Sequence, residues 1–236
     1  MSLRAWLSRL RGEAPRDAKW VADPLRPEIS HRVGPEPDWP QRVLDALNGT
    51  LAGSWSQPLG AVPAPDGRLA VCEPGAPERG ETADVEPGTY EVRLTVAQYM
   101  NGDEVEDERV SHAFAVLTEG GPIASVEPME RGEGEEVTLG VDGGLAAFAT
   151  PGTVERLAAE RTEGDVESLE TRLIEEMRAV YRHTRDWARM ATADGEAAVA
   201  AFSSGEGDGL YPIYLLHDPS GRTVGLAIDF FVDNEP

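Results

Sequence analysis

Apolar and polar residues alternate in a series of short segments after residue 59, and this two-residue period most limits how the chain can fold. The clearest case runs from Tyr90 to Val96, directly behind the turn signal Pro87-Gly88. A period of two puts successive side chains on opposite faces of a strand. By the same criteria, strands are expected over 59–62, 68–73, 110–118, 123–129, 137–141, 145–149, 197–202, 211–217 and 223–231. Short strands with hairpin-length connections predict an antiparallel sheet or sandwich rather than βαβ units.

Helical spacing is found before this pattern begins and interrupts it once. Asp38 is placed to cap a helix over 39–47, with Pro40 in the first turn. Thr150-Pro151 opens a second helix that runs to about residue 161, and Asp165 is placed to cap a third, which spans 166–181. The expected fold class is therefore α+β: mainly an antiparallel β-sheet or sandwich, with a few helices packed on one face.

The first 58 residues differ from the remainder in charge, proline spacing and tryptophan content. They are expected to form an N-terminal helix and a proline- and tryptophan-rich extension, followed by a β-rich domain over 59–236 with a helical insertion over 150–190. Within residues 1–11, the apolar side chains have helical spacing. This segment suits either contact with a membrane surface or partner, or a helix that lies on its own domain.

The charge of the chain is strongly negative and unevenly distributed. Its formal charge is −22, and residues after 60 hold 13 basic and 36 acidic side chains. Such a surface repels phosphate backbones, so nucleic acid is not an expected partner, whereas a basic protein is. The acidic runs 103–108 and 133–136 are expected to be solvated loops that could steer that partner.

Cysteine usage and hydropathy bear on the compartment. Cys72 is the one cysteine, so the chain can form no internal disulfide. No apolar run approaches the ~20 residues of a transmembrane helix, and the charged N-terminus lacks the pattern of a secretory signal. We expect a cytoplasmic protein without a transmembrane segment.

The densest motif lies near the C-terminus, where Gly205-Glu206-Gly207-Asp208-Gly209-Leu210-Tyr211-Pro212 precedes a hairpin that ends in Asp229-Phe230. This stretch resembles the C-terminal motif of the bacterial domain-of-unknown-function family 4241. The resemblance covers about 59–231 and includes Asp66-Gly67-Arg68-Leu69, Glu73-Pro74, Pro87-Gly88-Thr89-Tyr90 and Val141-Asp142-Gly143-Gly144.

The chain departs from the family pattern at two positions. Glu73 stands where that family tends to have aspartate, and Leu216-His217 stands where a glycine is usual. The family has no established activity. Some relatives resemble neighbours of toxin and immunity genes, which implies a protein-binding role.

Two interpretations of the Gly-Asp-Gly stretch remain open. Its glycines permit positive φ angles, and Gly205, Glu206, Gly207, Asp208, Gly209 and Tyr211 form a candidate functional loop. If the fold brings Asp142, Asp208 and Asp229 together with Glu206, the oxygen-rich cluster would suit Mg²⁺ or Ca²⁺. Alternatively, Asp208-Gly209 is a tight turn, and Asp142 and Asp229 satisfy nearby backbone donors.

Other chemistries fit less well. No lysine follows Gly205-Glu206-Gly207, so this stretch is not a phosphate loop, and the histidines share no metal-ligand spacing with each other or with Cys72. We therefore expect an acidic binding protein, of which the immunity type is one form, with no cofactor and a basic protein partner. The alternative is a divalent-metal-dependent hydrolase that uses Asp142, Glu206, Asp208 and Asp229.

Overall fold

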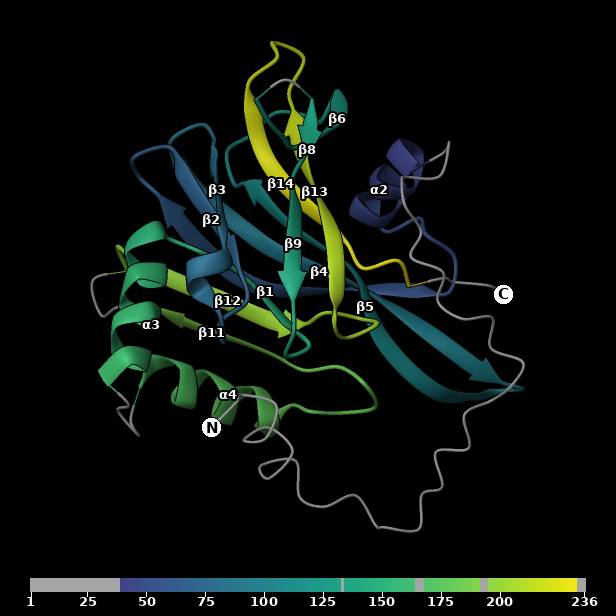
Figure 1. The fold of residues 1–236 in the computed structure, drawn as a ribbon. Helices are drawn as coiled ribbons and strands as arrows, with labels where there is room; N and C mark the ends of the chain where they lie inside the picture. The colour runs from purple at the N-terminus through teal and green to yellow at the C-terminus, as the bar shows by residue number, and fades with distance from the viewer. Residues whose placement is uncertain (1–38, 133, 164–167, 192–194, 233–236) are drawn as a thin grey trace.

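Two antiparallel sheets pack face to face in the computed structural model, which describes residues 39–132, 134–163, 168–191 and 195–232. Figure 1 shows the arrangement. The larger sheet has the strand order β1 (Ser54–Ala64), β4 (Gly88–Asn101), β5 (Glu104–Leu117), β14 (Thr223–Asp229), β13 (Gly209–His217) and β6 (Ser125–Pro128), and β9 (Thr138–Val141) also pairs with β13. Each of these pairings is antiparallel, which confirms the expected sheet type.

The smaller sheet has the order β11 (Trp187–Ala191), β12 (Ala198–Ser203), β10 (Leu145–Ala149), β2 (Arg68–Cys72) and β3 (Glu81–Asp84). Strands β7 (Glu130–Arg131) and β8 (Glu135–Glu136) form a separate two-stranded ribbon. A short 3-10 helix, η1 (Pro77–Arg79), lies between β2 and β3 in the chain. The chain crosses between the sheets several times, so neither sheet is built from one continuous segment.

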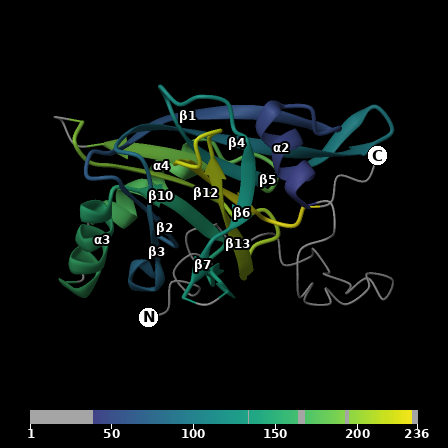
Figure 2. The same cartoon turned by 90° about the horizontal axis from the view of Figure 1, so that it is seen from above.

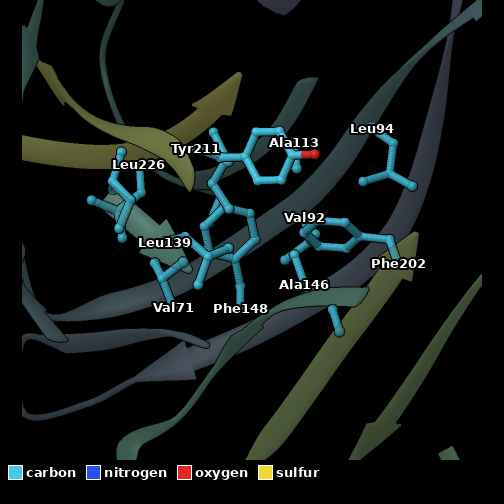
Figure 3. Packing of buried hydrophobic residues seen from close by; sticks show 14 of the residues in the cluster. Val71, Val92, Leu94, Ala113, Leu139, Ala146, Phe148, Phe202, Tyr211 and Leu226 are labelled. Atoms are coloured by element: carbon cyan, nitrogen blue, oxygen red, sulfur yellow. The ribbon is translucent and has the colours of Figure 1, made fainter. Parts of the chain in front are cut away.

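Alternate residues of both sheets form the core between them. Val92 and Leu94 from β4 and Val71 from β2 belong to one buried cluster with Phe148 from β10 and Phe202 from β12, which Figure 3 shows. All five side chains are fully buried. Branched and aromatic side chains suit a pleated, packed surface, so the alternation seen in the sequence becomes the inner face of a sandwich.

The three described helices cover the outer faces of the sandwich. Helices α3 (Pro151–Glu163) and α4 (Leu169–Ala179) lie together on one face, and Leu173 and Met177 of α4 pack against Ala147 and Ala201 of the smaller sheet. Helix α2 (Trp39–Asn48) covers the larger sheet, and Trp39 stacks on Tyr214 at 4.4 Å between ring centroids. Figure 2 separates α2 from α3 clearly. The α+β class is confirmed, but the helices lie on both outer faces of the sandwich and not on one.

The structure corrects several expected element boundaries. Residues 103–108 are not a loop: β5 already begins at Glu104 and pairs with β4 in a long hairpin. Strands β3 and β11 were not expected, because their sequences lack a clear apolar alternation. Helix α4 is capped by Ser168, whose hydroxyl accepts the Thr171 N–H, whereas the expected cap Asp165 lies outside the described residues.

The expected N-terminal segment is described only from residue 39 onward, and that part contributes α2 and the beginning of β1. The amphipathic stretch over 1–11 lies outside the described residues. In the part of the chain that the structure describes, no helix has the length and apolar character needed to cross a membrane.

Candidate functional site

The Gly-Asp-Gly loop, residues 204–209, connects β12 to β13 and is closed by its own hydrogen bonds. The Ser204 hydroxyl donates to the Gly207 carbonyl at 2.6 Å, and the Tyr211 hydroxyl donates to the same carbonyl at 2.9 Å. Ser204 N–H donates to the carbonyl of Gly144, which fixes the loop against the turn between β9 and β10. Gly205 and Gly207 have φ angles of +61° and +94°, so glycine is favoured at both positions.

The pairing of β9 with β13 brings two exposed aspartates together. Val141 lies opposite Gly209 in the last pair of this ladder, and the next positions outward are Asp142 and Asp208. Both aspartates are exposed. They therefore project at one end of the same ribbon although 66 positions separate them in the sequence.

Leu210 lies next to these aspartates and is 69 % exposed. It is paired with Gly140 of β9, and a Cβ atom placed at Gly140 would lie 3.7 Å from Leu210 Cδ2. The glycine thus leaves an open surface beside the leucine side chain. Leu210 therefore offers an exposed apolar contact close to the two aspartates.

Glu73 lies beneath the two aspartates, directly after β2, and is only 2 % exposed. Its Oε2 accepts the Asp142 N–H at 3.0 Å, and the Gly143 N–H also donates to this carboxylate. Its Oε1 is buried without a hydrogen-bond partner. Burial raises the pKa of Glu73, and the charges of Asp142 and Asp208 raise it further, against the lowering effect of the two backbone donors.

We call Glu73, Asp142, Asp208 and Leu210 the carboxylate patch. Sequence analysis noted Glu73 only as a departure from a family pattern and did not predict its place beside the aspartates. The available signal was an acidic residue and a proline immediately after the apolar strand 69–72. A carboxylate at the end of a buried strand is well placed to accept the N–H groups of a neighbouring turn.

Glu206 points away from this patch. Its Oε2 lies 3.0 Å from Arg109 Nη1, and Arg109 Nε donates to Asp107 Oδ2 at 2.9 Å. Thr184 also donates to Asp107. Burial acts to raise the pKa of Asp107, but the hydrogen bonds from Thr184 and Arg109 outweigh it and lower that pKa. Glu206 therefore ties the Gly-Asp-Gly loop to β5.

Asp229 belongs to a third environment, under α2. It lies opposite His112 in the β14–β5 ladder, with 3.7 Å between Asp229 Oδ1 and His112 Nε2, and it accepts the Phe231 N–H at 2.8 Å. Both side chains are buried. Burial lowers the pKa of His112, and the charge of Asp229 opposes that shift.

The expected cluster of Asp142, Glu206, Asp208 and Asp229 is therefore not formed. Asp142 and Asp208 lie together, whereas Glu206 pairs with Arg109 and Asp229 lies beside His112. Among the described residues, no group of three or more histidine, cysteine, aspartate or glutamate side chains could hold a metal ion. The aspartates cannot converge because β9 and β14 flank β13 over different parts of its length.

Comparison with known proteins agrees with the family resemblance. The family model described as a protein of unknown function (DUF4241) matches residues 62–228. The chain belongs to this DUF4241 family. The match includes Glu73, Asp142 and the whole Gly-Asp-Gly loop, so the carboxylate patch lies within the family domain. Neither a curated protein nor a solved structure matches the chain.

Replacement of Glu73 by glutamine should stabilise the protein at neutral pH. The raised pKa means that the folded state holds this proton more tightly than the unfolded state. The contribution of protonated Glu73 to the free energy of unfolding is fully present below its unfolded pKa near 4.5. It is lost as the pH rises through the pKa of Glu73 in the folded protein. Urea unfolding should therefore show Glu73→Gln to be more stable than the wild type at pH 7, with a smaller difference at pH 4. Equal curves at both pH values would contradict the prediction.

Proposed function

We propose that this chain is a protein-binding module that recognises a basic segment of a partner through the carboxylate patch. The observation that carries the proposal is the exposure of Leu210, Asp142 and Asp208 together above the buried Glu73. Interfaces commonly combine an apolar centre, which supplies affinity, with a charged rim, which supplies specificity and rate. The patch contains both parts.

The surrounding surface favours the same kind of partner. Asp103, Glu104 and Glu106 lie exposed on the β4–β5 hairpin, and among the described residues none has a side-chain hydrogen bond or an ion pair. Met100, at 52 % exposure, lies near the hairpin tip. Arg109 of β5 holds Glu206, so this hairpin contacts the Gly-Asp-Gly loop. Uncompensated negative charge accelerates encounter with a cationic partner.

This proposal covers an immunity-type protein, which acts by binding its partner, and we place that activity in the bacterial cytoplasm. A divalent-metal hydrolase remains an alternative. The geometry lends it little support, because the four carboxylates that it requires lie in three separate environments. A basic partner also accords with the formal charge of −22.

The proposal is tested with a labelled glycine–serine peptide that contains Arg-Leu-Arg, titrated with the full chain over a series of salt concentrations. We expect binding that weakens steeply as salt increases, because screening reduces the attraction between exposed charges. The double variant Asp142→Asn/Asp208→Asn should bind at least about tenfold more weakly, and Leu210→Ser should also lose affinity.

The matched control is Asp66→Asn/Asp84→Asn, which changes the net charge equally. These two exposed aspartates lie at the far end of β2 from Glu73, where Arg68 pairs with Asp84. This variant should retain nearly all the affinity of the wild type. Salt-independent binding, or an equal loss of affinity in the two double variants, would contradict recognition at the carboxylate patch.

A further inference from the structure

The hairpin of β4 and β5 extends beyond the strands on either side of it. The pairing of β1 with β4 ends at Ala97 and that of β14 with β5 ends at His112, whereas β4 and β5 stay paired as far as Asn101 and Glu104. Figure 1 and Figure 2 both show this projection. A two-stranded ribbon is marginally stable in water unless something packs on it. We call residues 98–107 the hairpin tip.

The hairpin tip combines an exposed apolar contact with negative charge. Met100 is 52 % exposed and lies opposite Val105, so the two side chains share one face of the ribbon. Asp103, Glu104 and Glu106 lie next to this pair along the ribbon, and all three are exposed. Methionine is unbranched and adapts its shape to an irregular surface. The hairpin tip therefore suits an occupant that is both apolar and cationic.

Residues 1–11 of the same chain have that composition. They include three arginines and no acidic side chain, and their apolar residues have helical spacing. An isolated helix of this length is unstable in water and needs a surface that covers its apolar side. Such a helix would be ~16 Å long, similar to the length that 98–101 of β4 and the turn beyond them span together.

We infer that the hairpin tip binds residues 1–11 of its own chain, with the apolar side of this segment on Met100 and Val105 and its arginines beside the acidic side chains. Opposite charge favours this occupant over the hairpin tip of a second copy, whose acidic residues would face those of the first. The inference goes beyond the proposed function, which places partner recognition at the carboxylate patch.

The connection between the segment and the hairpin is long enough for this contact. Helix α2 begins at Trp39 and packs in one cluster with Phe114 of β5, which lies at most about 34 Å along the strand from Glu104. Residues 12–38 can span up to about 90 Å. Because the segment and its site belong to one chain, their effective concentration is high, so a weak contact is enough to keep them together.

The inference is tested by paramagnetic NMR on the full chain with Ser8→Cys, which carries a nitroxide spin label. Cys72 is buried and its pKa is raised to about 12, so it does not react with the label. Ser8 lies on the opposite side of the expected helix from its leucines. At low salt, the label should lower the amide signals of 99–106 at least about twofold relative to the reduced label. The signals of 65–67, at the far end of the β1–β4 ladder, should not change.

Charge and apolar contact are tested separately. Glu104→Gln/Glu106→Gln should restore most of the lost signal, and so should salt at about 0.5 M, because both weaken the attraction between exposed charges. Met100→Ser should restore part of it. The matched control Asp66→Asn/Asp84→Asn removes the same charge at the opposite end of the ladder, so the signal loss should persist.

An absence of signal loss at 99–106, or a loss that neither salt nor Glu104→Gln/Glu106→Gln reduces, would overturn the inference. A mixture of spin-labelled chain and separate ¹⁵N-labelled chain tests whether the contact lies within one molecule. Signal loss at 99–106 in this mixture would assign the contact to a second copy and overturn the inference as well. Binding of the Arg-Leu-Arg peptide at the carboxylate patch is measured separately, so the proposed function can stand without this inference.

Discussion

Replacement of Arg185 by methionine should lower the free energy of unfolding by about 3 kcal/mol, because it leaves a buried carboxylate without its cation. Arg185 Nε and Nη2 lie 2.8 and 2.7 Å from Glu108 Oε2. Its guanidinium also lies against two indole rings, 5.0 Å from the centroid of Trp55 and 4.7 Å from that of Trp187. The contacts with all three of these residues are lost together in the variant.

The position of this group between the sheets explains the size of the effect. Trp55 and Glu108 belong to β1 and β5 of the larger sheet, whereas Trp187 begins β11 of the smaller sheet. Gln98 and Trp55 donate to the other oxygen of Glu108, so both oxygens of this carboxylate have hydrogen-bond partners. Arg185 thus joins the two halves of the sandwich at one edge.

The matched control is Arg182→Met, which removes an exposed arginine from the same loop and should change stability by less than about 0.5 kcal/mol. In the double variant Arg185→Met/Glu108→Leu, no charge is left unpaired, so part of the loss should be recovered. Urea unfolding of the wild type and the three variants measures each change in the free energy of unfolding. A loss of under about 1 kcal/mol for Arg185→Met, or no recovery in the double variant, would contradict this account.

The effect should also depend on pH. Hydrogen bonds from Gln98 and Arg185 outweigh burial and lower the pKa of Glu108. A lowered folded pKa contributes stability that is present above the unfolded pKa near 4.5 and is lost as the pH falls through the folded value. The difference between the wild type and Arg185→Met should therefore shrink in acid.

Regular patterns in the sequence predicted much of the fold. The alternation from Tyr90 to Val96 lies within β4, where the even-numbered apolar side chains face the core. The helix expected over 39–47 is α2, which continues to Asn48. These elements were predictable because periodicity records which face of a local segment is buried, and that face is set within a few neighbouring residues.

The sequence was less informative where burial depends on distant pairing. The run 103–108 has the composition of a solvated loop, yet Glu108 is buried because Arg185, 77 positions later, neutralises it. Strand β11 was missed for a related reason: its pattern of tryptophan, arginine and methionine becomes a strand only by pairing with β12. When the partner of a buried charged residue is remote in sequence, the local pattern does not show that this face of the strand is buried.

The candidate site was also only partly predictable from the sequence. The Gly-Asp-Gly loop and Asp142 were identifiable from composition, but their proximity follows from the pairing of Val141 with Gly209 across two strands. No local pattern could have excluded Asp229 from that neighbourhood or added Glu73 to it. Strand order decides both, and sequence spacing alone does not specify strand order.

Replacement of Gly205 by alanine should be the most damaging single-methyl change in the Gly-Asp-Gly loop, with a loss of about 3 kcal/mol or more. A Cβ atom at this position would lie 2.4 Å from the backbone oxygen of Val110, 2.7 Å from Val232 Cγ2 and 2.9 Å from Phe230 Cβ. The Val110 oxygen belongs to β5 and cannot move without disturbing that strand. The residue also has a φ of +61°, which disfavours alanine.

Gly207→Ala in the same loop provides the control. Its φ is +94°, but a Cβ there would meet no atom within 4 Å, so its loss reflects backbone strain alone, about 1–2 kcal/mol. Urea unfolding should place Gly205→Ala well below Gly207→Ala. That order would mean that Gly205 is required because the loop packs against β5. Equal losses would show instead that positive φ, and not close packing, accounts for the glycine at position 205.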